Sequence, residues 1–394
     1  LTISGTSAIF ADGMSVSGSA GLIFTSASNT TLTLSNTAKT FGNITFSSNT
    51  TRTVNVNFAS SNAITQTVGV FTVGNNVTLN LNGPANKVFG GISCGTNLRL
   101  YQLNNATVNG TANLGASTSL TISGAGYGVD NVVFNGPMSL TQTLIYARLR
   151  NVVFNAGATL GGLIELHAVK LNTGTLTAAA NATILMYTPS VFETATSLVV
   201  SGSARLYCFT NGQTFKNSFV LNTGALMDVS SSQTYQGAFT INSGVTANFG
   251  GVTQNFTQPV SVAGSSVVTF SNTGLATLND VTLAAGSTWK FSAPGTTNAN
   301  GDFTTSGSCS LAVTLTSNTG AQAAVKFSSF PDPEYVNVSN INNTGSLLTI
   351  LYGVGSNNTN INISSARTLY WVGNSGSWNQ IAHWSLTSGG AGGE

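Results

Sequence analysis

Glycine residues that follow short apolar runs recur about every 21 residues, and this period limits what the chain can fold into. The first series has steps of 20 or 21 residues: Gly74, Gly95, Gly115, Gly136 and Gly157. A second series has steps of 20 to 22 residues: Gly202, Gly224, Gly244, Gly264, Gly286 and Gly307. A fixed period of this length is the signature of a repeat protein, in which each repeat buries its apolar side chains against its neighbours.

Each period contains three short segments in which apolar and polar residues alternate. Around Gly244, the run 239–241 precedes the glycine and the run 245–249 follows it. A third apolar point recurs with the same period at Phe215, Tyr235, Phe256 and Leu278. Alternation places every second side chain of a strand on the same side. Three such strands in about 21 residues are what one coil of a parallel β-helix needs.

We therefore predict an all-β fold, a right-handed parallel β-solenoid with coils of about 21 residues. The handedness follows from the preference of parallel strands for right-handed crossovers. About 17 coils spaced by one strand separation give a rod on the order of 80 Å long. Glycine and asparagine are expected at the corners, where positive φ angles and stacked amides are favourable. The competing architecture is an array of antiparallel β-sandwiches, which does not predict one glycine spacing.

The composition supports a stacked β-protein and argues against several functions. Charged residues make up 6% of the chain and the net charge is +2, so no electrostatic footprint for nucleic acid or anionic lipid is present. Cys94, Cys208 and Cys309 lie far apart without a paired motif, and we expect three buried small apolar side chains. Stability must then come from the core and from the hydrogen-bonded ladders.

The period divides the chain into two expected units. Residues 1–365 form the solenoid, with irregular coils near 1–70, 158–200 and 308–365, and residues 366–394 form a Trp-rich capping or linking segment. The chain begins within the pattern and ends in a glycine-rich stretch, so we interpret it as a fragment of a longer polypeptide. Targeting and anchoring signals are expected outside it.

The C-terminal unit carries the one recognisable motif. Three of the four tryptophans lie in the segment 370–385, in the pattern Trp371-Val372-Gly373, then Gly376-Ser377-Trp378-Asn379, then His383-Trp384-Ser385. This pattern resembles a linker motif of very large, repetitive cell-surface proteins of Bacteroidota, some of which look like gliding-motility adhesins exported by type IX secretion. The motif covers about 20 residues, and the solenoid is similar to that family only in style.

The resemblance implies an extracellular, cell-surface location, with attachment to the outer membrane through parts of the protein outside this chain. It also implies tandem copies of the module, so the expected partners are neighbouring modules or further copies of the chain. Trp371, Trp378, His383 and Trp384 then form a cap over the last coil or a joint between modules. A carbohydrate-stacking platform is the alternative for these tryptophans.

Enzymes with parallel β-helices need clustered carboxylates and a basic residue, often with calcium. Ten acidic residues are scattered along the chain without such a motif, and His167 and His383 lack metal-ligand spacing. We predict no enzymatic activity, no catalytic residue, no metal and no cofactor.

Ionisable residues are nevertheless concentrated between Asp130 and Lys170, and some of them share one face of a strand. Arg148 alternates with Arg150, and Glu165 with His167, so the two pairs are expected to stack on adjacent coils. A solvated, salt-bridged patch is the plain interpretation, and a contact site for a glycan or another partner is the functional one. Its residues are Arg148, Arg150, Glu165, His167 and Lys170.

The sequence thus favours a structural or adhesive module of a giant secreted surface protein, acting as a stiff stalk or an adhesion surface. One alternative is a carbohydrate-binding or polysaccharide-degrading β-helix protein that uses the patch between residues 130 and 170. The other is a subunit of a self-assembling extracellular filament, whose ends stack between molecules. No contact with nucleic acid and no membrane insertion is expected.

Overall fold

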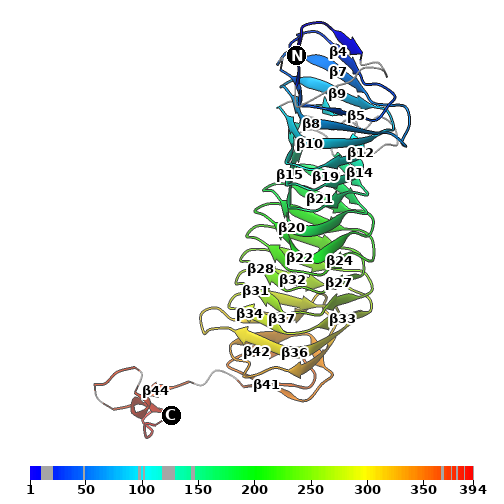
Figure 1. Ribbon diagram of the computed structural model, residues 1–394. Helices are drawn as coiled ribbons and strands as arrows, with labels where there is room; N and C mark the ends of the chain where they lie inside the picture. Colours follow the sequence, from blue (N-terminus) through cyan, green and yellow to red (C-terminus); the bar gives the residue numbers. More distant parts are fainter. Residues whose placement is uncertain are drawn as a thin grey trace.

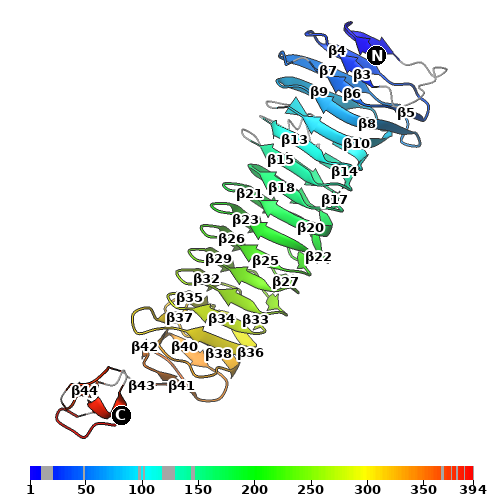
Figure 2. The same cartoon turned by 60° about the vertical axis from the view of Figure 1, so that its left-hand side comes forward.

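The computed structural model describes residues 1–9, 21–47, 49–95, 99–100, 103–117, 129–142, 147–364, 368–373, 375–378, 380–385 and 387–393. The chain winds into a parallel β-solenoid of about 15 turns, which confirms the predicted fold class (Figure 1). Of the described strands, 36 join one continuous hydrogen-bonded sheet. The coils follow one another in chain order along the rod, as Figure 2 shows from a second side.

Three faces of parallel strands enclose the core, and we name them A, B and C in the order in which each coil visits them. Face A consists of β1 (Thr2–Ile3), β3 (Leu22–Phe24), β6 (Ile44–Phe46), the later parts of β8 (Thr65–Val73) and β10 (Asn86–Cys94), β13 (Ala112–Ser117), β15 (Met138–Gln142), β18 (Ala158–Gly161), the later parts of β20 (Lys170–Ala178) and β22 (Val191–Val200), β25 (Phe219–Leu221), β28 (Phe239–Ile241), β31 (Val260–Val262), β34 (Val281–Ala284) and the later part of β36 (Thr296–Ser306).

Face B begins as a separate five-stranded sheet and continues within the large one. Its strands are β2 (Ser7–Ile9), β4 (Thr30–Thr33), β7 (Arg52–Asn57), β9 (Val77–Asn82) and β11 (Arg99–Leu100), and then the first parts of β12 (Leu103–Val108) and β14 (Val129–Phe134), β16 (Ala147–Arg150), β19 (Leu163–His167), β21 (Thr183–Met186), β23 (Arg205–Cys208), β26 (Leu226–Val229), β29 (Thr246–Phe249), β32 (Val267–Phe270), β35 (Thr288–Phe291), β37 (Val313–Ser317), β39 (Val336–Ser339) and β42 (Val354–Ser356).

Face C closes each coil. It consists of β5 (Lys39–Phe41), the first parts of β8 and β10, the later parts of β12 (Leu103–Val108) and β14 (Val129–Phe134), β17 (Val153–Phe154), the first parts of β20 and β22, β24 (Thr214–Phe215), β27 (Gln233–Tyr235), β30 (Gln254–Phe256), β33 (Leu275–Leu278), the first part of β36, β38 (Ala323–Ser329) and β40 (Ile341–Asn343).

The remaining elements lie at the C-terminal end. β41 (Leu348–Leu351) and β43 (Ile361–Ser364) form a parallel pair in the last coils. β44 (Tyr370–Trp371), the short 3₁₀ helix η1 (Ile381–His383) and β45 (Trp384–Ser385) form a small unit, drawn apart from the last coil in both views (Figure 1, Figure 2).

Alternation along the strands fills the interior, as the sequence predicts. Val260 and Val262 are buried while Ser261 between them is exposed. The four predicted apolar points Phe215, Tyr235, Phe256 and Leu278 are all buried on face C. The rings of the first three stack in a file, with centroid separations of 5.3 and 4.4 Å.

Coil length varies more than the glycine steps suggest. Residues paired between adjacent coils are 20 apart at Asn222 and Asn242, but 25 apart at Asn55 and Asn80 and 26 apart at Asn109 and Asn135. These longer coils are the reason why the chain makes about 15 turns and not 17. The corresponding rod length is on the order of 70 Å.

The glycines of the first series do not mark a single corner. Gly74 and Gly95 follow the face A strands, whereas Gly136 precedes face A and lies against Gly110 of the coil before. A Cβ at Gly136 would come within 2.3 Å of the Gly110 carbonyl oxygen, so this corner leaves no room for a side chain. In the second series, Gly224, Gly244 and Gly286 adopt positive φ angles after face A, as corner glycines are expected to.

The prediction of stacked asparagines is confirmed, whereas the prediction of three buried cysteines holds for two of them. Stacked asparagines are present: the amides of Asn109, Asn135, Asn155 and Asn172 form a hydrogen-bonded ladder with distances of 2.8, 2.7 and 2.6 Å. The expectation of three buried cysteines is wrong for Cys309, which is exposed, while Cys94 and Cys208 are buried. Cys309 lies in the loop between β36 and β37, where the chain leaves the regular coil.

Candidate functional site

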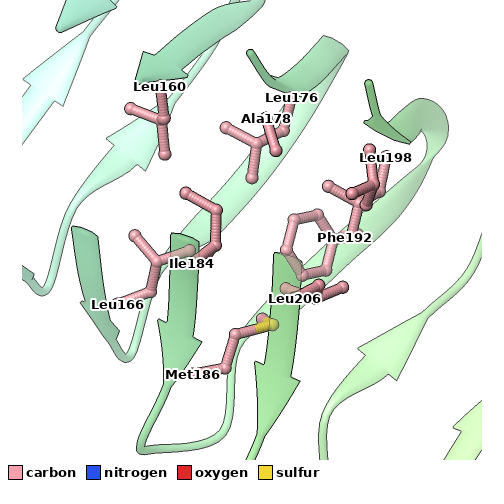
Figure 3. Close-up of a pocket in the computed structure, with 10 residues that line it drawn as sticks. Leu160, Leu166, Leu176, Ala178, Ile184, Met186, Phe192, Leu198 and Leu206 are labelled. Carbon is pink, nitrogen blue, oxygen red and sulfur yellow. The ribbon is translucent and has the colours of Figure 1, made fainter. Parts of the chain in front are cut away.

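The interior of the solenoid offers no space for a ligand in the described coils that Figure 3 shows. Leucine, isoleucine, methionine and phenylalanine side chains from β18 to β23 converge on a gap of about 10 Å³ (Figure 3). That volume is about the size of one water molecule, and its lining is apolar, so it does not hold water. In these coils a functional site would lie on the outside.

The predicted ionic patch exists on face B, where β16 and β19 lie side by side. Arg148 is in register with Glu165, and its Nε lies 2.5 Å from Glu165 Oε2. Arg150 is in register with His167 and pairs with Asp130 of β14, donating from Nε to Oδ1 over 3.0 Å. The prediction that the arginines and the Glu165–His167 pair stack on adjacent coils is thus confirmed.

His167 completes this group as a neutral side chain. Its Nε2 lies 3.6 Å from Glu165 Oε2. Burial lowers the pKa of His167, and the nearby Arg148 and Arg150 lower it further, while Glu165 opposes them. The imidazole is therefore uncharged at neutral pH and serves as a ring surface and a polar contact.

Lys170 does not lie with the other predicted residues, because the chain turns to face C before it. Its Nζ lies 3.6 Å from Glu193 Oε1, and Lys216 donates to the other oxygen of the same carboxylate over 2.8 Å. The hydrogen bond from Lys216 is the main cause of the lowered pKa of Glu193. The predicted patch is thus two groups on two faces, and Glu193 and Lys216 of the second group were not anticipated.

An aromatic stack next to the ionic patch is the feature that sequence reasoning missed. The ring of Tyr187 stacks on His167, with centroids 5.4 Å apart, and on Phe209, with centroids 5.1 Å apart. Tyr207 lies parallel to Phe209 at 5.9 Å and an interplanar angle of 3°. The available signal was the spacing, since His167, Tyr187 and Phe209 follow buried strand residues at steps of 20 and 22.

A second surface feature is an open groove of about 420 Å³ near the last coils. The loop that carries Ser308 and Cys309 forms one side of it, and Asn337 and Val354 contribute from β39 and β42. Tyr335 and Tyr352 stack along it, with ring centroids 5.3 Å apart. The groove is of ligand size, but its described lining holds no charged side chain and no clustered nucleophile and base.

The predicted joint residues pack on one another in the C-terminal unit. Trp371 stacks on His383, with centroids 4.7 Å apart, and Trp384 lies across it at an angle of 89°. The indole Nε1 of Trp384 donates to the Trp378 carbonyl oxygen over 2.9 Å. Trp378 itself is 77% exposed, so one ring of the cluster faces solvent. Whether this unit caps a coil or joins modules stays a prediction.

The described parts of the chain contain no group of three or more His, Cys, Asp or Glu residues placed to hold a metal ion. Nor do they contain a helix with the length and apolarity required to cross a membrane. No known protein family, no curated protein and no solved structure matches this chain.

Proposed function

We propose that this chain is a structural and adhesive module of a secreted surface protein, acting as a stiff stalk that also presents a contact surface. The observation that carries the proposal is the single sheet of 36 described strands, because bending the rod requires breaking many ladder hydrogen bonds together. A spacer needs this property.

The exterior is suited to a rod that stands in water. Outward positions carry mainly serine, threonine and asparagine, and amide ladders such as that of Asn135 and Asn155 link adjacent coils. Only 6% of the residues are charged, so stiffness does not depend on surface ion pairs that salt would screen. The extracellular location and the tandem arrangement are supported by the resemblance of the Trp-rich motif alone.

The enzymatic alternative is weakened by how the carboxylates of the patch are held. Glu165 is paired with Arg148, Asp130 with Arg150, and Glu193 with two lysines. A general acid or base needs access to a substrate proton. Glu165→Ala and Arg148→Ala can be assayed against polysaccharides; turnover by the natural chain that these changes abolish would replace the structural proposal with an enzymatic one.

Force measurement on single molecules tests the stalk directly. The chain would be held by its two ends in an atomic force microscope, and we expect little extension until whole coils are released in sequence. A chain that lengthens steadily at low force would contradict the proposal. Electron microscopy across a concentration series addresses the filament alternative, since rods that lengthen with concentration indicate end-to-end stacking.

A further inference from the structure

We propose that the aromatic stack on face B, formed by His167, Tyr187, Phe209 and Tyr207, is a binding site for an uncharged polysaccharide. This inference deepens the adhesive part of the proposed function and names its ligand class. The stalk itself does not depend on it.

The first observation is the position of the stack at the end of a continuous outward file. The amide of Tyr187 donates to the Leu166 carbonyl, that of Phe209 to the Met186 carbonyl, and that of Ser230 to the Cys208 carbonyl. These bonds place Tyr187, Phe209 and Ser230 at the same point of successive coils, and Gly250 occupies that point in the next coil. Serine and glycine are too small to cover a ring, so the aromatic stack ends in a step at Phe209.

The second observation is exposure. Phe209 is 43% exposed and Tyr187 is 36% exposed, whereas Ser230 and Gly250 hold the same point of the next two coils. Rings left in water cost free energy unless a ligand covers them. The C–H faces of a sugar ring suit this surface, because an aromatic face carries partial negative charge and C–H groups carry partial positive charge.

The third observation is the set of polar groups beside the rings. Asp228 is in register with Tyr207, and Asn248 is in register with Asp228, which places a carboxylate and an amide on the coils after the step. Glu165 and Arg148 lie on the coils before it. Such groups suit the hydroxyls around a sugar ring, which donate and accept hydrogen bonds.

The charges indicate an uncharged ligand. Arg148 and Arg150 are each paired with a carboxylate, as are Lys170 and Lys216 on the neighbouring face. Arg205, on the same strand as Tyr207, forms no ion pair with a described residue, but the Asp228 carboxylate in register with Tyr207 lies beside the rings. An acidic polysaccharide would have to displace the paired carboxylates and would meet Asp228. A neutral chain meets no such cost, and its repeating rings can extend along the rod, where coils repeat every ~4.8 Å.

The test is affinity electrophoresis of the whole chain in gels that contain a neutral β-glucan, mannan or xyloglucan, or the anionic polymer alginate. We expect retardation in at least one neutral gel. Phe209→Ser and Tyr187→Ser should weaken binding at least tenfold, and they should fold because Ser230 already occupies this position one coil after Phe209. Leu275→Ser is the matched control, since Leu275 is 39% exposed on face C, and it should bind as the natural chain does.

Three outcomes would overturn the inference: no retardation in any neutral gel, binding to alginate alone, or equal binding of Phe209→Ser. Sedimentation of the same proteins separates a further possibility, because a dimer that Phe209→Ser dissociates would identify a second copy as the occupant. Circular dichroism confirms folding of each variant. If the natural chain binds no glycan but its force curve is that of a stiff rod, the glycan site is refuted and the stalk is supported. If the chain extends at low force but still binds glycan, the stalk is refuted and the glycan site is supported.

Discussion

One inward position at the start of face C is filled differently in two regions of the molecule. Near the N-terminal end it holds Gln66 and then Lys87, which are in register on adjacent coils. In the middle it holds Gln213, Gln233 and Gln254. Both regions must satisfy backbone carbonyls that point inward where the chain turns from face B to face C.

The lysine meets this need with a buried charge. Its Nζ donates to the carbonyl oxygens of Gly83, Ala85 and Asn104 over 2.9, 3.1 and 3.3 Å, and it lies 5.2 Å from the Phe58 ring centroid. Lys87 is only 1% exposed, and this burial lowers its pKa from 10.5 to about 8.

The glutamines meet the same need without a charge. Gln213 donates to the Thr188 carbonyl over 2.9 Å and accepts from the Ser190 amide over 2.8 Å. Gln254 donates to the carbonyls of Ser231 and Gly250 over 2.7 and 2.5 Å. The comparison teaches that the N-terminal and middle regions of one rod can be held by equivalent contacts and still respond differently to pH.

The largest expected effect comes from raising the pH around Lys87. The folded pKa lies below the unfolded one, so the charge penalty is complete below about pH 8 and disappears as the pH rises toward 10.5. Stability of the N-terminal coils should therefore increase over this range, by on the order of 3 kcal/mol at most. Hydrogen exchange of the β10 amides, compared between the natural chain and Lys87→Met at each pH, measures it.

That comparison is needed because other groups act in the opposite direction. Burial raises the pKa of Cys94 and of Cys208 to about 12, so the unfolded chain loses these protons first and stability falls as the pH rises above 9. The difference between the natural chain and Lys87→Met cancels this contribution. A difference that does not change between pH 8 and 10 would show that Lys87 has an ordinary pKa.

A smaller effect is expected from Gln254→Met in the middle region. The change leaves the Ser231 and Gly250 carbonyls without their side-chain donor, and it should cost about 2 kcal/mol. Because no charge is involved, the loss should be the same at pH 7 and pH 9.5. Hydrogen exchange of β27 and β30 provides the measurement. A cost that varies with pH would show that the two positions do not differ in their dependence on pH.

Tyr235→Phe should stabilise the middle coils by about 1 kcal/mol. The Tyr235 hydroxyl is buried and has no hydrogen-bond partner among the described residues, while its neighbours in the file are Phe215 and Phe256. Phe256→Tyr is the reciprocal control and should destabilise the same coils. Denaturant midpoints of the two variants that move in the same direction would refute this account.

The smallest effect is expected where amides pair on the surface. Asn242 donates to Asn222 over 2.9 Å at a partly buried corner, and Asn242→Ala should cost no more than about 1 kcal/mol. Water can replace this partner, which it cannot do for Gln254 inside. Equal costs for the two changes, measured by hydrogen exchange of β28 and β30, would show that burial does not separate the two kinds of amide.

Much of the site was accessible from the sequence, although its limits were not. Arg148, Arg150, Glu165 and His167 could be placed together because two alternating pairs about one coil apart must stack. Lys170 could not be separated from them, since the turn between faces B and C falls at Ala168, which takes a positive φ of 51° that no sequence rule predicts. The outward direction of Tyr187 and Phe209 was hidden because aromatic residues in strands are usually assigned to the core.

The sequence by itself determined the fold class, because a period of about 21 residues with three alternating runs can bury its apolar side chains only by stacking coils. Tertiary structure decided how many coils there are, which corner each glycine occupies, that Cys309 is exposed, and which rings face water. Those outcomes depend on the local length of each coil, which shifts every later residue around the three faces. Hydrogen-bonded pairing with the preceding and following coils sets the length of each coil. The average period of the sequence does not specify that length.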